Sequence, residues 1–261
     1  MAVKITSAEN AQVKLAASLH RAKMIRAEQL YLAEGAHLAA EALRSGVTIE
    51  RAFVEEGCSA EVEVLFAELE RRDVPCALLP RRLVEKISEA KTPQGIVLLV
   101  RLPEEQLKLH TDGRYLLLEN LQDPGNVGNI LRSAESFDFD GVLLCGETAE
   151  VYTPKAVRGS MGSVFRLPTA RYTDGAAAAC ALRGAGIPLF TAELRGDSRL
   201  PDELPERGLC IAIGNEGRGI TEELSALADA SVEIPMSGKT ESLSAPVAAA
   251  VLMWELFRRR R

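Results

Sequence analysis

Residues 114–137 read RYLLLENLQDPGNVGNILRSAESF, and this stretch decides the fold class. It opens with the apolar run 115–118, passes through a loop that contains Gly125 and Gly128, and continues with helical spacing over residues 130–137. A short, continuous apolar run followed by a loop and an amphipathic segment is typical of a buried strand that leads into a helix. The stretch therefore predicts one strand–loop–helix step of a parallel sheet.

The same rhythm continues toward the C-terminus. Apolar runs at 142–144, 188–190, 209–213 and 232–234 alternate with helical stretches at 176–182, 222–228 and 247–259. Continuous apolar strands separated by helices indicate a parallel sheet covered on both faces. We therefore expect one α/β domain over residues 114–261.

The first hundred residues predict a second, smaller α/β domain. Helical spacing over 8–26 and 36–44 flanks a short strand at 30–33. Residues 102–113 (LPEEQLKLHTDG) are polar and end on the turn pair Asp112-Gly113, which is typical of a linker. The predicted division is a domain at 1–105, a linker at 106–113 and a domain at 114–261.

Composition limits the function classes. The chain has 261 residues, a hydrophobic content of 47%, a net charge of −6 and a pI near 5.3, so any contact with nucleic acid must come from local basic patches. Its five cysteines are scattered without C-x-x-C spacing, and its three histidines are not clustered with them. This pattern predicts free thiols and no metal site.

The N-terminus and the hydropathy predict a soluble, cytoplasmic protein. MAVKITSAENAQVK lacks the apolar core of a signal peptide. No apolar run approaches the ~20 residues that a membrane-spanning helix needs. We therefore expect no membrane partner.

The first of three glycine-bearing loops carries Asn126 and Arg132. Gly125 and Gly128 permit close backbone approach, and a helix N-terminus with a guanidinium in its first turn suits a phosphate or another oxyanion. The alternative is an ordinary strand-to-helix turn, capped by Asn126 or Asn129, with Arg132 on a solvated face.

The second loop follows the apolar run 209–213 and holds three glycines with Glu216. Alternate glycines after a strand let a flat ring or a ribose lie against the backbone at the carboxyl edge of a parallel sheet. The pattern is not G-x-G-x-x-G and comes late in the chain, which disfavours a dinucleotide-binding fold. A plain glycine turn with a solvated Glu216 is the alternative.

The third loop, residues 234–246, precedes the segment VAAAVLMWELF. A helix that is apolar on nearly every side must be buried all round, in a core or in a subunit interface. Pro246 suits the first turn of this helix. Ser242 and Ser244 are each a candidate helix cap or a candidate catalytic residue.

Together the loops resemble the signature motifs of the SpoU (TrmH-like) RNA methyltransferases of the SPOUT superfamily. N-x-x-D-P-x-N-V-G-x-I-x-R-S-A occurs at 120–134, G-N-E-G-x-G-I at 214–220 and I-P-M-x-G-x-x-E-S-L at 234–243. Residues 155–168 (KAVRGSMGSVFRLP) resemble the family's insert between the first two motifs. More loosely, residues 21–26 and 32–35 resemble the substrate-binding domain that precedes this catalytic domain in the family.

The resemblance implies a parallel-sheet SPOUT domain with a C-terminal trefoil knot, preceded by a smaller α/β substrate-binding domain. It also implies a homodimer that uses S-adenosylmethionine, without a metal, to methylate a ribose 2′-hydroxyl of ribosomal RNA or, less often, transfer RNA. Matching the motifs places three residues around the cofactor: Gly214, Ile234 and Leu243. It places four at catalytic or site-holding positions: Asn126, Arg132, Glu216 and Ser242.

Ser244 is the departure from the family pattern, because S-L-S stands where the family has S-L-N. A serine hydroxyl can also donate and accept a hydrogen bond, so we include Ser244 among the catalytic candidates. Arg132 is the family's proposed proton acceptor. A guanidinium with a pKa above about 12 is a poor base, so we favour phosphate gripping and substrate alignment as its main role.

We expect two local basic patches to bind RNA: Arg21, Lys23 and Arg26 on the N-terminal helix, and Arg158 near the active site. The alternative for the first three is a solvated helix face with i,i+4 pairing.

Two rival functions remain at this point. One is a non-catalytic RNA-binding homologue that keeps the fold, which Ser244 would favour, whereas Asn126, Arg132, Glu216 and Ser242 favour the enzyme. The other is a doubly wound small-molecule enzyme, which needs a glycine fingerprint after its first strand that the chain lacks.

Overall fold

The computed structural model describes residues 2–104, 107–196, 198–240 and 242–259. The chain forms two compact units. The N-terminal unit comprises Met1–Glu104 together with Glu150–Arg166, and the C-terminal unit comprises Glu105–Ala149 together with Leu167–Arg261.

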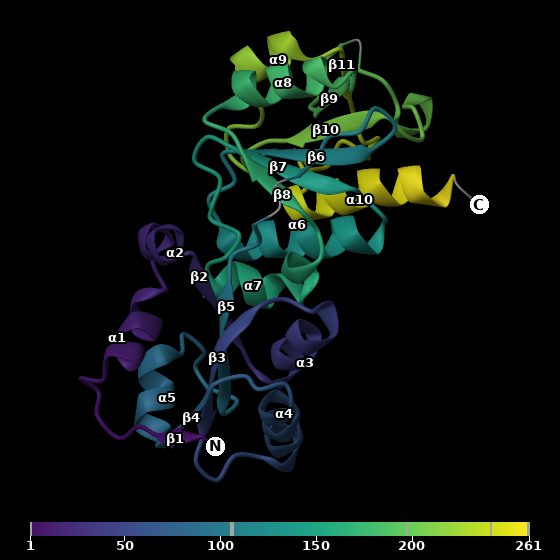
Figure 1. Ribbon diagram of the computed structural model, residues 1–261. Helices are drawn as coiled ribbons and strands as arrows, with labels where there is room; N and C mark the ends of the chain where they lie inside the picture. Colours follow the sequence, from purple (N-terminus) through teal and green to yellow (C-terminus); the bar gives the residue numbers. More distant parts are fainter. Residues whose placement is uncertain (1, 105–106, 197, 241, 260–261) are drawn as a thin grey trace. The chain divides into compact units, whose positions relative to one another are not determined.

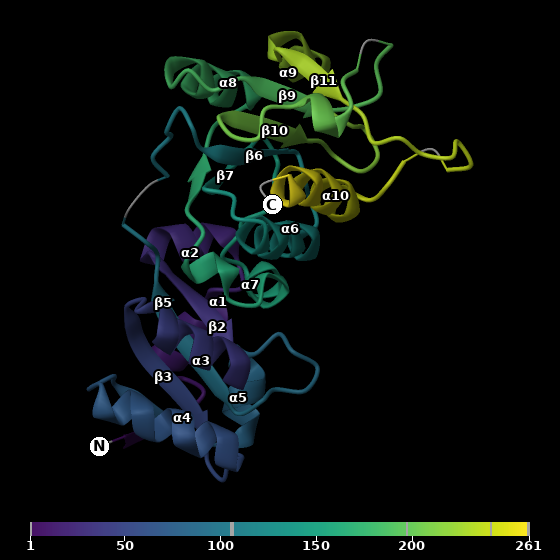
Figure 2. The same cartoon turned by 90° about the vertical axis from the view of Figure 1, so that its right-hand side faces the viewer.

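The N-terminal unit is built on a mixed five-stranded sheet. Its strands, in spatial order, are β1 (Val3–Lys4), β4 (Cys76–Leu79), β3 (Ile49–Glu55), β5 (Ile96–Arg101) and β2 (Leu30–Glu34). The first three are parallel, and β5 runs antiparallel to both of its neighbours. Helices α1 (Ala11–Ser18) and α5 (Arg81–Ile87) cover one face, and α3 (Ala36–Ser45) and α4 (Ala60–Arg71) cover the other (Figures 1 and 2).

The helix expected over residues 8–26 is wrong as a single element. The structure ends α1 at Ser18 and starts α2 (Ala22–Glu28) after an extended Arg21. Leu19 is fully buried between the two helices, and a ring nitrogen of His20 lies 3.0 Å from the carbonyl oxygen of Ile87. Tertiary contacts therefore break a segment that helical spacing alone would continue.

Residues 150–166 fold with the N-terminal unit, although the sequence-based division placed them within 114–261. Here α7 (Pro154–Ser160) and the 3₁₀ turn Ser163–Phe165 pack beside β2 (Figure 1). The ring of Tyr31 lies 4.9 Å from that of Tyr152, between centroids. Ala156 and Val157 are fully buried, so this segment belongs to the core of that unit.

The C-terminal unit is an α/β layer with a wholly parallel sheet, as predicted. Its strands, in spatial order, are β11 (Ala230–Val232), β9 (Leu189–Ala192), β10 (Leu209–Ile213), β6 (Arg114–Glu119), β7 (Gly141–Cys145) and β8 (Thr169–Arg171). Central β6, β7 and β10 are buried along their whole length, which accounts for the apolar runs that they contain. β8 is too short and too exposed to give such a signal.

Helices cover both faces of this sheet. Figures 1 and 2 show α6 (Pro124–Ser136) and α10 (Ala245–Arg258) on one face, with α8 (Gly175–Gly184) and α9 (Glu222–Leu227) on the other. The last helix was expected to be buried all round, in a core or in a subunit interface, and within the described chain one of its faces is exposed. Val247, Val251 and Trp254 are 47%, 38% and 48% exposed. In the part of the chain that the structure describes, no helix is long and apolar enough to span a membrane.

Candidate functional site

The three glycine-bearing loops leave the sheet at one edge, because β6, β10 and β11 are parallel and each loop follows the carboxyl end of its strand. This is the edge at which open parallel sheets bind their ligands. All three loops belong to the C-terminal unit.

The first loop presents Asn126 to the second loop. Asp123, and neither Asn126 nor Asn129, caps α6 by accepting a hydrogen bond from the Asn126 backbone N–H at 3.0 Å. The Asn126 side chain is therefore available, and its Nδ2 donates to Oε1 of Glu216 at 2.6 Å. Two residues that lie 90 positions apart are thus joined at the site.

Arg132 lies further along α6 than the sequence predicted. The helix begins at Pro124, so Arg132 occupies its third turn rather than its first. Its side chain is exposed, and within the described ranges its guanidinium has no protein partner. A cation in this state is available to an anionic ligand.

Asn215 shapes the second loop. Its Oδ1 accepts from the backbone N–H groups of Gly217 and Arg218 at 2.9 and 3.1 Å, and its Nδ2 donates to the carbonyl of Asn120 at 2.9 Å. A Cβ on Gly214 would lie 2.3 Å from the carbonyl carbon of Gly219. The tight turn therefore explains the glycine at 214.

Glu119 and Asn120, at the end of β6, bind the neighbouring loops. The buried carboxylate of Glu119 accepts from the backbone N–H and the hydroxyl of Thr221, each at 2.8 Å. Asn120 has a φ of 57°, a left-handed conformation that asparagine tolerates, and its Oδ1 accepts from the backbone of Glu147 at 2.9 Å. Neither role was predicted from the sequence. An Asn directly after a buried strand was the available signal.

The third loop forms one wall of a pocket of about 180 Å³ at the ends of β9 and β11. Two predicted cofactor residues, Ile234 and Leu243, line it, as does Ser242. Glu193 and Glu233 add carboxylates to a wall that is otherwise largely apolar. Gly214 is not among the lining residues.

Ser244 stands directly before α10 and is exposed. Its hydroxyl makes no helix-capping hydrogen bond, and it is the Ser244 carbonyl that accepts from the Ala248 backbone N–H at 2.9 Å. Helix capping therefore does not account for this side chain.

The four predicted RNA-binding residues all lie in the N-terminal unit. Arg21 and Lys23 are exposed at the start of α2. Arg26 pairs with the nearly buried carboxylate of Glu150 at 2.8 Å. Of the three basic residues, Arg26 therefore already has an intramolecular ion-pair partner.

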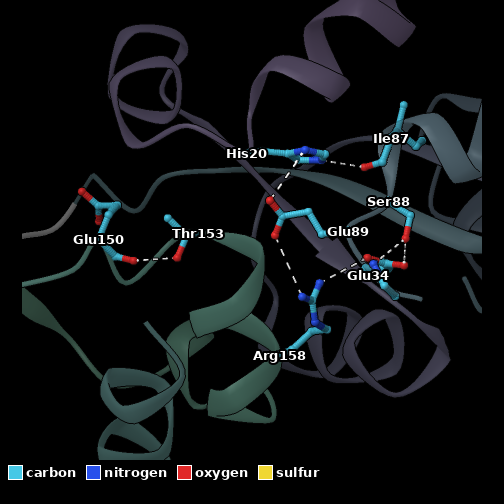
Figure 3. A network of polar contacts seen from close by, with 9 residues as sticks. His20, Glu34, Ile87, Ser88, Glu89, Glu150, Thr153 and Arg158 are labelled. Carbon is cyan, nitrogen blue, oxygen red and sulfur yellow. Dashed lines mark hydrogen bonds and ion pairs between the residues drawn. The ribbon is translucent and has the colours of Figure 1, made fainter. Parts of the chain in front are cut away.

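Arg158 belongs to a network of polar contacts around the buried carboxylate of Glu34 (Figure 3). Arg158 lies 3.4 Å from Glu34 and 3.9 Å from Glu89, and Ser88 donates a short hydrogen bond to Glu34. Nδ1 of His20 lies 3.7 Å from Glu89. A buried carboxylate needs such partners, so Arg158 has a structural role in this unit.

The structure shows no candidate metal centre in the residues that it describes. Within 2–104, 107–196, 198–240 and 242–259, no three His, Cys, Asp or Glu side chains come together so as to hold a metal ion. All five cysteines are free thiols. Burial raises the pKa of Cys145 to about 12, which keeps that thiol protonated and unreactive at neutral pH.

Two family models match the chain. The SpoU rRNA methylase family matches residues 113–254, and an MRM3-like substrate-binding domain matches residues 10–98. A 23S rRNA (guanosine(2553)-2′-O)-methyltransferase of Bacillus subtilis is 31% identical over 97% of this chain and 98% of its own length. A 23S rRNA (uridine(2479)-2′-O)-methyltransferase of Streptomyces viridochromogenes is 33% identical over 70% of this chain and 67% of its own length.

Solved structures agree with the sequence relatives. An AdoMet-bound rRNA methyltransferase from Sinorhizobium meliloti matches with a TM-score of 0.86 and 28% identity over 98% of this chain and 97% of that one. The SpoU methyltransferase AviRb from Streptomyces viridochromogenes, in complex with AdoMet, matches with a TM-score of 0.84 and 26% identity over 97% and 98%. The motif loops, the parallel sheet and these matches agree: the chain belongs to the SpoU rRNA methylase family.

Proposed function

We propose that this enzyme transfers a methyl group from S-adenosylmethionine to a ribose 2′-hydroxyl of ribosomal RNA. The observation that carries the proposal is the 2.6 Å hydrogen bond between Asn126 and Glu216. It joins the first two motif loops at the ligand-binding edge of the sheet, and the exposed guanidinium of Arg132 lies on the helix that continues the first loop.

The pocket at the third loop, at about 180 Å³, offers surface for part of S-adenosylmethionine. Ile234, Leu243 and Met236 offer apolar surface to an adenine ring, and the carboxylate of Glu233 suits ribose hydroxyls or a positive charge. Glu193 also lines the pocket, but its Oε1 already accepts from the hydroxyls of Thr191 and Ser225. Bound there, the cofactor supplies a methyl group that its sulfonium already activates. Gly214 permits the tight turn of the second loop, because a side chain there would clash with Gly219.

The protein's own contribution is alignment of the ribose. Arg132 is suited to hold the phosphate next to the target nucleotide, because a guanidinium donates to two phosphate oxygens at once. Asn126 holds the Glu216 carboxylate in one orientation, which leaves its second oxygen available to the hydroxyl. Ser242 lies at the pocket wall, and Ser244 follows it toward α10. Holding the hydroxyl in line with the methyl group is the main catalytic requirement.

We further propose a homodimer that forms through α10. Val247, Val251 and Trp254 follow the i, i+4, i+7 spacing of one helix face and are all exposed. A second copy of the chain would cover this face. The C-terminal trefoil knot, the substrate-binding role of the N-terminal domain and a cytoplasmic location belong to the same proposal, which rests on the likeness to the methyltransferases described above.

The test is incorporation of radiolabelled methyl from S-adenosylmethionine into RNA from a strain that lacks this protein. We expect label in ribosomal RNA and little in transfer RNA from the same cells. Label in transfer RNA alone would contradict the substrate, and binding of both ligands without any transfer would favour a non-catalytic RNA-binding homologue.

A further inference from the structure

A cavity of about 530 Å³ lies wholly within the N-terminal unit. It is formed by the start of α3, the loop that joins β3 to α4, the first turn of α4 and residues 93–95 before β5. Its volume falls in the range of about 300–1,000 Å³ that is typical of small-molecule sites. None of the predicted RNA-binding residues lines it.

The lining of the cavity combines buried apolar residues with exposed polar ones. Of the residues that line it, Ala36, Val62 and Pro93 are buried, whereas His37 and Glu61 are exposed. A flat ring with polar edges matches this arrangement, because its faces can pack on apolar groups while its edge forms hydrogen bonds with the polar ones. Unpaired RNA bases are recognised in this way.

The charged residues that line the cavity favour a neutral base over a phosphate group as its ligand. The Arg81 guanidinium already pairs with Glu55 at 3.2 Å and with Glu85 at 3.0 Å, so two carboxylates offset its charge. The Glu61 carboxylate has no protein partner in the described part of the chain. A lining with an excess of carboxylate repels the phosphodiester backbone.

Hydrogen-bonding groups in the lining match the edge of guanine. Oε1 of Gln94 accepts from the Ala36 backbone N–H at 3.1 Å, which leaves the NH₂ of the same amide as a donor. Gly35 allows this packing, since a Cβ there would lie 2.6 Å from the same oxygen. Guanine presents two adjacent N–H donors, which suit the two oxygens of Glu61, and one carbonyl acceptor, which suits the Gln94 amide.

We propose that this cavity receives an unpaired guanine base of the substrate RNA, with Glu61 as the acceptor that distinguishes guanine from the other bases. The proposal rests on the proposed function, in that it takes RNA as the substrate. It assigns nucleotide discrimination to a base pocket in the N-terminal unit, separate from the basic residues of α2.

The test is fluorescence anisotropy of the full chain with short, 5′-labelled oligouridylates that carry one central guanosine, adenosine or cytidine. We expect the guanosine oligomer to bind about tenfold more tightly than the others, because a carboxylate that accepts two hydrogen bonds discriminates strongly between bases. Glu61→Gln should abolish this preference, since one of the two accepting oxygens becomes an NH₂ group that would face a guanine N–H donor. The same variant should bind unsubstituted oligouridylate at least as tightly as the wild type.

Glu63→Gln is the matched control, because Glu63 is exposed on the same helix but does not line the cavity. Both substitutions remove one negative charge, so a purely electrostatic effect would be equal in the two. A guanosine preference that survives in Glu61→Gln, or that is absent from the wild type, would overturn the base pocket. Methyl transfer to ribosomal RNA by the wild type is measured in parallel: if transfer is intact, such a result leaves the proposed function standing, whereas absence of transfer to any RNA contradicts the proposed function itself.

Discussion

Ser244 is the residue at which the chain departs from its family's pattern, and the structure argues against a helix-capping role for its hydroxyl. Its hydroxyl does not cap α10, so Ser244→Ala should change the free energy of unfolding by less than about 0.5 kcal/mol. If the hydroxyl instead helps to hold the ribose, turnover should fall by about tenfold to a hundredfold. Thermal melting and single-turnover methyl transfer on the same variant separate the two effects.

Ser244→Asn is the companion variant, because it restores the residue of the family motif. We expect it to retain or to raise methyl transfer. A wild type that binds cofactor and RNA without transfer, together with activity that appears only in Ser244→Asn, would contradict the catalytic role that we assign to this serine.

Arg132 has an exposed guanidinium on α6 and is not among the residues that line the pocket of the third loop. Arg132→Ala should therefore lower methyl transfer by about a hundredfold or more while it leaves cofactor affinity nearly unchanged. Calorimetric titration with S-adenosylmethionine and a transfer assay measure the two quantities. Arg132→Lys, which keeps the charge but loses the bidentate geometry, should recover only part of the activity. Equal losses of affinity and transfer would indicate a structural role instead.

At the residue scale, the sequence predicted which loop residues lie at the site, but not which of their side chains form hydrogen bonds with one another. The motif spacing singled out Asn126 and Glu216, but only the fold shows that their side chains meet. The roles of Glu119 and Asn120 depend on Thr221 and Asn215, which lie about a hundred positions away in the chain. A local pattern contains no information about such partners.

At the scale of elements, the apolar sequence of α10 predicts a helix with little contact with solvent, but it does not say which surface covers each face of that helix. Its exposed stripe of Val247, Val251 and Trp254 predicts that Trp254→Glu prevents dimerisation, since an unpaired charge in a closed interface costs several kcal/mol. Light scattering after size-exclusion chromatography should give the mass of a monomer for this variant and of a dimer for the wild type. Glu223→Gln on the opposite face of the sheet is the control and should remain dimeric. A dimeric Trp254→Glu, or a monomeric wild type, would place the interface elsewhere or remove it.

The elements that the sequence predicted correctly share a physical cause. The central strands of the parallel sheet are covered on both faces, so they contain continuous apolar runs and their existence is evident. Edge strand β8 is half-exposed and was missed. The break between α1 and α2 was missed for a different reason, because Leu19 and His20 are held by contacts with distant segments.

At the scale of the whole molecule, residues 150–166 complicate the separation of the two units. They interrupt the segment of the chain that carries the motifs, and yet their side chains Val151, Ala156 and Val157 are buried in the N-terminal unit. A fragment of residues 112–261 would leave this apolar surface without its partner. We expect the fragment to melt at a lower temperature than the full chain or to aggregate.

The matched control is a second fragment in which a short glycine–serine linker replaces residues 150–166. It should be more soluble than the unmodified fragment and should still bind S-adenosylmethionine, because the three loops all lie outside the replaced segment. A fragment of residues 112–261 that melts as high as the full chain would show that the packing of residues 150–166 contributes little.

The central claim is the transfer of a methyl group to a ribose oxygen, and the most direct measurement is mass spectrometry of ribosomal RNA treated with the full-length enzyme and S-adenosylmethionine. The account predicts one nucleotide whose ribose carries an additional methyl group, which also makes the adjacent phosphodiester resistant to alkaline hydrolysis. The modification should be absent with Arg132→Ala. A methyl group located on a base, or ribosomal RNA that stays unmodified although the protein binds both ligands, would contradict it.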